Sequence, residues 1–171
     1  GRMAAVDLRS GARIWDQNVG SFNTPWLAGD YLFVTTLDSE VVAVHRRDGR
    51  VRWVQQLEQF SDPQRKRGRI VWTGPTLVGN RLVVLNSEGQ AVAAVDLTAF
   101  AVTRHIPLDA NPVQMVDDPV RPRVYAVTPG NGEIVELSVE KLAVLRRARL
   151  GAQPSHAKIS ADGKYLWALC R

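Results

Sequence analysis

The feature that most constrains the fold is an internal repeat. Three stretches align with one another: "DYLFVTTLDSEVVAVHRRDGRVRWVQQL" from Asp30, "NRLVVLNSEGQAVAAVDLTAFAVTRHIPL" from Asn80 and "PRVYAVTPGNGEIVELSVEKLAVLRRARL" from Pro122. Each contains three β-rich runs separated by turn residues, and a shorter run of the same kind precedes each one: "TPWLAG", "GPTLVG" and "NPVQMV". Apolar residues nowhere keep a helical spacing, and consecutive apolar runs such as "RLVVL" suit strands that are buried on both faces. The repeat therefore predicts units of four antiparallel strands.

The spacing of the units indicates the architecture. Equivalent positions lie about 50, 42 and 41 residues apart, which is the spacing of β-propeller blades, counted from Tyr31 through Arg81 and Arg123 to Lys164. Glycine, asparagine and aspartate tolerate the positive φ of tight turns, and they occur at Gly29-Asp30, Gly79-Asn80 and Asp162-Gly163. We therefore predict an all-β propeller of four-stranded antiparallel blades, with one blade each in residues 24–57, 71–108 and 111–150.

The two ends of the chain complement each other in register. Residues 1–20 match the third and outer strands of a blade, whereas residues 153–171 match its inner two strands. Together they make one further blade, so residues 1–171 form a single propeller domain of four blade-equivalents. Pairing the ends would remove exposed sheet edges. It can occur within one chain, as a four-bladed ring, or by strand exchange between two copies, as an eight-bladed dimer.

The first half of the chain carries a recognisable repeat motif of the form Ala-x-Asp-x-x-Thr-Gly-x-x-x-Trp. Its residues are Asp7, Gly11 and Trp15 in the first copy, with Gly49 and Trp53 in a second, degenerate copy. Up to about residue 86 the chain resembles the quinoprotein-like (PQQ-repeat) propellers, and most of all the BamB-type lipoproteins of outer-membrane assembly. The resemblance implies a non-enzymatic scaffold that binds an outer-membrane assembly subunit in the periplasm or cell envelope.

The second half of the chain has a different repeat motif. From about residue 91 the chain resembles the surface-antigen and lactonase-like propellers, which have YVTN repeats and a Ser-x-Asp-Gly turn, here with Asp162 and Gly163. Phe100 and Arg104 stand where the first repeat type has its glycine and tryptophan. Two repeat types in one chain suggest a hybrid propeller, natural or engineered.

The motif residues have a structural interpretation. A tryptophan on an outer strand can lie over the next blade, while a short polar side chain and a glycine fix the preceding turn. We therefore predict structural roles for Asp7, Gly11, Trp15, Gly49, Trp53, Asp162 and Gly163. Packing is also the expected role of Trp26, Trp72 and Trp167.

No catalytic, metal or cofactor site is predicted. His45, His105 and His156 stand alone in different units, without the spacing of metal ligands, and Asp117-Asp118 precedes a proline in a turn. Quinoprotein cofactor binding would need a Cys-Cys pair, whereas Cys170 is the single cysteine. A metal-dependent, lactonase-like hydrolase at the propeller funnel remains the alternative function. A piece of a larger propeller, which would expose apolar strand edges and aggregate, remains a third interpretation.

The strongest departure from the repeat is "QFSDPQRKRGRIVW", residues 59–72. Loops carry recognition in scaffolds of this kind because the sheets only hold them in place, and this one concentrates positive charge. The segment is a candidate loop for binding a protein partner through Arg65, Lys66, Arg67, Arg69 and Trp72, and the other interpretation, which the bare sequence favours, is a solvated flexible loop. No nucleic-acid partner is expected, since aromatic residues do not interleave with the basic ones, and no apolar run is long enough for a membrane span.

Overall fold

The computed structural model describes residues 1–86, 91–99 and 101–171, and the regular elements in these ranges are all β-strands. Every pairing between them is antiparallel. Phe100, which we placed at a motif position, lies outside the described residues, as does the side chain of Arg104. The predicted all-β class is confirmed.

Three sheets are four-stranded meanders in chain order. The first sheet comprises β3 (Trp26–Ala28), β4 (Tyr31–Thr35), β5 (Glu40–His45) and β6 (Val51–Gln56). The second comprises β9 (Trp72–Val78), β10 (Arg81–Asn86), β11 (Ala91–Asp96) and β12 (Ala101–Pro107). The third comprises β13 (Gln114–Asp117), β14 (Arg123–Thr128), β15 (Glu133–Ser138) and β16 (Ala143–Arg149).

Three two-stranded hairpins complete the described strands. The N-terminal hairpin is β1 (Met3–Val6) with β2 (Arg13–Gln17), and the C-terminal hairpin is β17 (His156–Ile159) with β18 (Leu166–Leu169). Between the first and second sheets lies a third hairpin of β7 (Phe60–Asp62) and β8 (Arg67–Arg69). We call it the basic hairpin.

The sheets are stacked face to face, which explains the consecutive apolar residues in their middle strands. On β10, Leu82 and Val84 belong to a buried cluster with the first sheet, whereas Val83 and Leu85 belong to a cluster with the third. Neighbouring side chains of a strand point to opposite faces, so a sheet covered on both sides needs an unbroken apolar run. The described residues form no helix that could cross a membrane.

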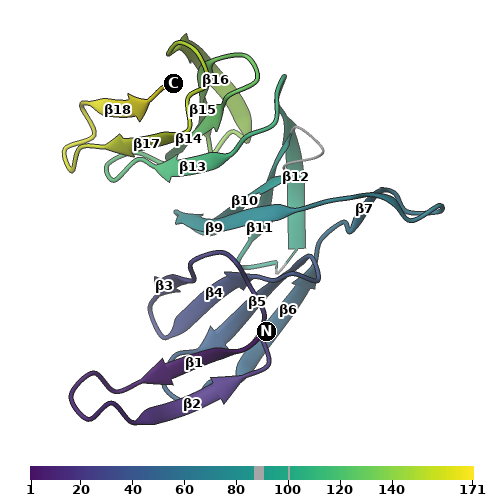
Figure 1. The fold of residues 1–171 in the computed structure, drawn as a ribbon, viewed down its shortest axis with the longest axis vertical. Helices are drawn as coiled ribbons and strands as arrows, with labels where there is room; N and C mark the ends of the chain where they lie inside the picture. The colour runs from purple at the N-terminus through teal and green to yellow at the C-terminus, as the bar shows by residue number, and fades with distance from the viewer. Residues whose placement is uncertain (87–90, 100) are drawn as a thin grey trace.

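The first strands of the sheets lie next to one another. β9 contacts β3 and β13, and β13 contacts β17. Because each following strand of a sheet lies farther out, the stack fans outward from these first strands, as Figure 1 shows. The arrangement is that of propeller blades around an axis.

The four-bladed ring that we considered within one chain is not formed. Among the described strands β1 pairs only with β2 and β18 only with β17, and Figure 1 shows the two hairpins at opposite ends of the stack. Closing so few blades requires wide angles between neighbours. Such angles would open the tight face-to-face contacts between the sheets, which bury most of the apolar core.

Candidate functional site

The segment that we predicted as a loop is an ordered hairpin. β7 and β8 pair through Phe60 with Arg69 and Asp62 with Arg67. At its tip the Asp62 carboxylate accepts a hydrogen bond from the backbone N–H of Arg65 at 3.1 Å. The sequence pattern missed the strands because three-residue strands carry too few side chains to show an alternation.

The hairpin turns back through two residues with positive φ, Lys66 at 50° and Gly68 at 65°. A Cβ at Gly68 would lie 2.0 Å from the Ser61 Oγ. Glycine is therefore the residue that lets the two short strands approach each other.

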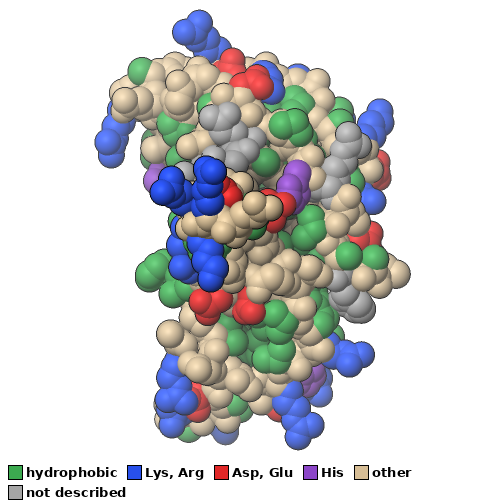
Figure 2. Space-filling model, turned by 90° about the vertical axis from the view of Figure 1, so that its right-hand side faces the viewer, with side chains coloured by type: hydrophobic (Ala, Val, Ile, Leu, Met, Phe, Trp, Pro, Cys, Tyr) green, Lys and Arg blue, Asp and Glu red, His purple; other side chains and the backbone are tan. Residues whose placement is uncertain are grey.

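The tip of the hairpin presents positive charge to solvent. Arg65, Lys66 and Arg67 are exposed. Figure 2, seen from the side on which the hairpin projects, shows Lys and Arg side chains gathered at mid-height of the molecule. Arg69 differs, because its guanidinium donates a 2.9 Å hydrogen bond to the carbonyl of Leu37 and so ties the hairpin to the first sheet.

Trp72 supports the hairpin from inside. Its side chain is buried, and its indole N–H donates a hydrogen bond to the Glu58 carbonyl at 2.8 Å. The neighbouring Ile70 is buried too, and its backbone N–H is bonded to the carbonyl of Gln59. The structure therefore separates the five predicted partner-binding residues into three exposed cations, one tethering arginine and one buried anchor.

Trp15 and Gly49 join two neighbouring units. The Trp15 side chain is buried, and its Nε1–H donates a 2.9 Å hydrogen bond to the carbonyl of Arg46 in the first sheet. Its ring lies against Gly49, where an added Cβ would come within 2.7 Å of two ring carbons. The glycine thus makes room for the tryptophan of the preceding unit.

The other structural-repeat residues lie in turns or between sheets. Asp7 accepts hydrogen bonds from the backbone of Ser10 and Arg9 and from the Ser10 hydroxyl, and these bonds lower its pKa. Gly11 follows with a φ of 72°. Trp53 packs in a tilted arrangement against Phe33, with ring centroids 6.1 Å apart.

The Ser-x-Asp-Gly turn reaches the neighbouring sheet. Asp162 accepts a 2.6 Å hydrogen bond from the Ser160 hydroxyl, and this bond lowers its pKa. Gly163 has a φ of 68°, and its carbonyl accepts a 2.6 Å hydrogen bond from Arg121 of the preceding unit. The turn therefore links the C-terminal hairpin to the third sheet.

A buried carboxylate in the third sheet was missed by the sequence analysis. Glu136 is 2% exposed and accepts hydrogen bonds from both Arg123 and Arg146. The equivalent positions of the other sheets, paired in the same way with β4 and β10, hold Ala43 and Ala94. The signal was available as a charged residue inside the apolar run of "EIVELS".

The three histidines remain apart. His45 bonds to Asp48 at 2.8 Å in a turn of the first sheet, His105 lies on β12 near Trp72, and His156 begins β17. Among the residues that the structure describes, no group of three or more His, Cys, Asp or Glu side chains is placed to hold a metal ion.

Comparison with known proteins supports the resemblance of the first part of the chain. Residues 1–55 match the family model described as "Outer membrane protein assembly factor BamB". Two curated proteins of that name are similar: one from Marinobacter adhaerens, 29% identical over 92 residues, and one from Salmonella typhimurium, 33% identical over 89 residues. Each match covers 52% of this chain, which spans about a fifth (20%) of the length of either relative.

Solved structures of low sequence identity share the fold. Hydrazine synthase of Kuenenia stuttgartiensis matches with a TM-score of 0.70 and 19% identity, over 90% of this chain and 44% of the other. The Pan2 WD40 domain of Neurospora crassa matches with a TM-score of 0.68 and 11% identity, over 94% and 48%. These likenesses support the propeller fold alone. The chain thus has a β-propeller type of fold, and its first third, residues 1–55, resembles the PQQ-repeat protein BamB.

Proposed function

We propose that this chain is a non-enzymatic protein-interaction propeller of the bacterial cell envelope, which docks an acidic surface of a partner protein on its basic hairpin. The observation that carries the proposal is the hairpin itself. It is an inserted, ordered element that displays Arg65, Lys66 and Arg67 to solvent while Arg69 and Trp72 hold its base.

The similarity of residues 1–55 to an outer-membrane protein assembly factor supports the envelope location and the scaffold role. By that similarity, the partner is a subunit of the outer-membrane assembly machinery. A positive patch on a rigid support speeds the encounter with an acidic partner and fixes the orientation of docking. Such a mechanism needs no catalytic group.

Charge reversal at the hairpin tip tests this function. We expect the double variant Arg65→Glu and Arg67→Glu to bind the purified periplasmic part of the assembly subunit at least about tenfold more weakly, because rim charges act on the encounter. The measurement is a Kd by biolayer interferometry at low and at high salt. The difference between the two proteins should shrink at high salt, since screening weakens exposed charge pairs.

The double variant Arg9→Glu and Arg13→Glu provides the matched control, because both arginines are exposed in the N-terminal hairpin and the change in net charge is the same. It should bind like the unchanged protein. If both variants bind equally weakly, the effect comes from net charge and not from the hairpin. If the hairpin variant binds like the unchanged protein, the hairpin is not part of the interface.

No observation favours the alternative of a lactonase-like hydrolase at the funnel. The described histidines lie in three separate units, and the buried carboxylates Asp118 and Glu136 are each bonded to arginine. The two carboxylates are therefore engaged in structural ion pairs with arginine. A hybrid origin of the two repeat types remains a hypothesis from the sequence.

Self-association by strand exchange is a separate expectation. The terminal hairpins leave apolar side chains in solvent, with Val6 51% and Ile14 58% exposed at one end and Trp167 59% and Leu169 67% exposed at the other. Trp167, which we predicted to pack, is thus covered only in part, with its ring centroid 6.3 Å from that of Tyr165. Pairing of β18 with β1 of a second copy would cover these residues and complete a blade at each junction.

The solution mass tests the strand exchange. Light scattering across a concentration series should give twice the 18.9 kDa chain mass if two copies close a ring. A constant monomer mass would contradict the strand exchange, and an open-ended rise with concentration would indicate non-specific edge pairing instead.

A further inference from the structure

Three adjacent hollows lie on the face where the first strands begin, and we call them together the groove. They have volumes of about 430, 400 and 570 Å³. The first two share Phe22, Asn23 and Thr73, and the second and third share Val113 and Gln114. Because neighbouring hollows share lining residues, the groove extends as a row of adjacent hollows from the base of the basic hairpin to the C-terminal hairpin.

The middle of the groove is apolar and open to solvent. Phe22 is 92% exposed and lines two of the three hollows, and Val71 and Val113 are each at least half exposed on either side of it. An aromatic ring with so little cover costs free energy in water. It is the kind of anchor that a partner buries at the centre of an interface.

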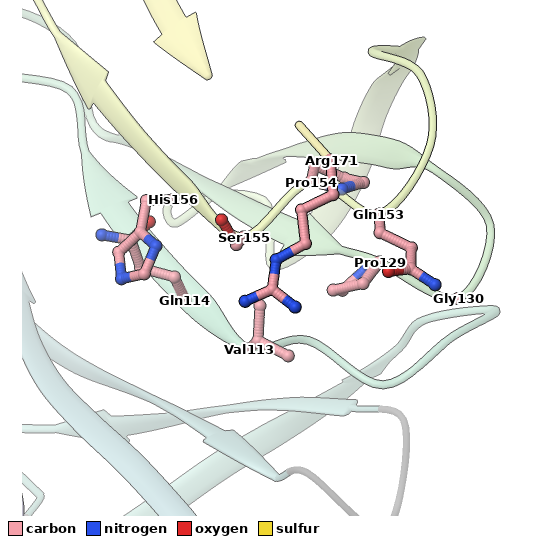
Figure 3. A pocket seen from close by; sticks show the side chains of 9 residues that line it. All are labelled: Val113, Gln114, Pro129, Gly130, Gln153, Pro154, Ser155, His156 and Arg171. Atoms are coloured by element: carbon pink, nitrogen blue, oxygen red, sulfur yellow. The ribbon is translucent and has the colours of Figure 1, made fainter. Parts of the chain in front are cut away.

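Positive charge stands at both ends of the groove. Arg69 lines one end, and Arg171 lines the other. Figure 3 shows the Arg171 guanidinium beside Val113, within the last hollow. Among the residues that the structure describes, none that lines the three hollows is acidic, although the chain contains 17 Asp and Glu residues.

The floor of the groove is cross-linked. The Asn23 side chain donates to the carbonyl of Trp72 at 3.1 Å and so ties the first connection to the second sheet. At the other end the Gln114 side chain accepts a 2.6 Å hydrogen bond from the backbone N–H of Ala157. These amides connect successive units, so the groove is formed before a ligand arrives and little ordering has to accompany binding.

We infer that this groove binds an extended peptide segment with an apolar centre and acidic residues on both sides. The apolar centre packs on Phe22, and the carboxylates lie near Arg69 at one end and Arg171 at the other. An extended chain can follow a row of adjacent hollows, and carboxylates complement the cationic ends of that row. The site is separate from the tip of the basic hairpin, which lines none of the three hollows.

The test uses two fluorescein-labelled synthetic peptides and the whole chain. One is Asp-Glu-Val-Leu-Val-Phe-Glu-Asp, and the other has lysine at the four outer positions, both blocked at their ends. Fluorescence anisotropy should show saturable binding of the acidic peptide and at least about tenfold weaker binding of the basic one. Phe22→Ser should weaken binding of the acidic peptide about tenfold, as expected for loss of a central aromatic anchor.

Leu8→Ser is the matched control, since Leu8 is 99% exposed in the turn of the N-terminal hairpin, outside the groove. It should leave binding unchanged. Arg171→Glu should weaken the acidic peptide and strengthen the basic one. Both substituted apolar side chains are almost fully exposed, so neither change removes a core contact.

The double variant Arg65→Glu and Arg67→Glu separates this site from the proposed hairpin function. If that variant loses the partner protein but keeps the peptide, both proposals stand. If Phe22→Ser loses the peptide and the hairpin variant keeps it, the result supports the groove, even if the hairpin proves to bind no partner protein. Equal affinity for both peptides, or equal weakening by Leu8→Ser, would overturn the groove proposal.

Discussion

Replacing Gly49 by alanine is expected to lower the free energy of unfolding by about 3 kcal/mol, the sum of a backbone term and a packing term. Gly49 has a φ of 73°, where a Cβ meets its own backbone. The same Cβ would come within 2.7 Å of the Trp15 ring. Urea unfolding followed by circular dichroism measures the change.

The variant Gly11→Ala separates the backbone term from the packing term. Gly11 has nearly the same φ, 72°, but an added Cβ there meets no atom within 4 Å. It should cost only about 1 kcal/mol, the backbone term. Equal costs at Gly11 and Gly49 would contradict the tight contact with Trp15.

A double-mutant cycle with Trp15→Ala tests the same contact from the other side. Trp15→Ala alone should cost about 3 to 5 kcal/mol, since it removes a buried ring. On that background Gly49→Ala should cost no more than Gly11→Ala. The difference is the coupling energy between the two units.

Replacing Glu136 by glutamine is expected to cost about 2 kcal/mol at neutral pH, less than for a fully buried pair because the arginines can reach water. Arg146 is 70% and Arg123 34% exposed, whereas Glu136 is 2% exposed. Glu133→Gln on the same strand is the control, because Glu133 is 26% exposed and lies 3.9 Å from its arginine. It should change stability by less than about 0.5 kcal/mol.

The pH dependence of the Glu136 effect has a definite sign. Burial alone would raise the pKa of Glu136, but the hydrogen bonds from Arg146 and Arg123 outweigh burial and hold the pKa below its ordinary 4.5. A carboxyl with a lowered folded-state pKa stabilises the protein above the unfolded pKa and loses that effect as pH falls through the folded pKa. The stability difference between the unchanged protein and Glu136→Gln should thus be constant above about pH 5 and shrink below 4.5.

Other carboxyl groups, such as Asp118, also have lowered pKa values, so both proteins lose stability in acid. The contribution of Glu136 is the difference between their two curves, measured by urea unfolding at a series of pH values. A difference that stays constant down to pH 3 would contradict the ion pairs of Glu136 with Arg123 and Arg146.

The all-β propeller architecture could be predicted because the repeat occurs in three complete units and in part at both ends of the sequence. Each unit repeats the same order of strands and turns, so errors at single residues do not change the class. The basic hairpin was harder, since its two strands of three residues are defined by pairing between Phe60 and Arg69 rather than by a pattern. For Trp72 we predicted two roles, packing and partner binding, and the burial of its side chain decides for packing.

The groove had no sequence signal, because its walls come from three connections that are far apart in the chain. Phe22, Val71 and Val113 lie in different inter-unit segments, and only the stacking of the sheets brings them to one face. Glu136 had a weak signal, a charge within an apolar run, but its two arginines lie on neighbouring strands.

By itself the sequence determined the period, the strands of the three sheets and the turn residues, since these depend on neighbours within one unit. The resemblance of residues 1–55 to an outer-membrane assembly factor could also be recognised from the sequence. Only the tertiary structure decided that the terminal hairpins stay apart, that Trp15 needs Gly49 and that the three hollows of the groove are adjacent. These features depend on the angle at which sheets pack, and that angle is set by side-chain contacts between units which no single repeat encodes.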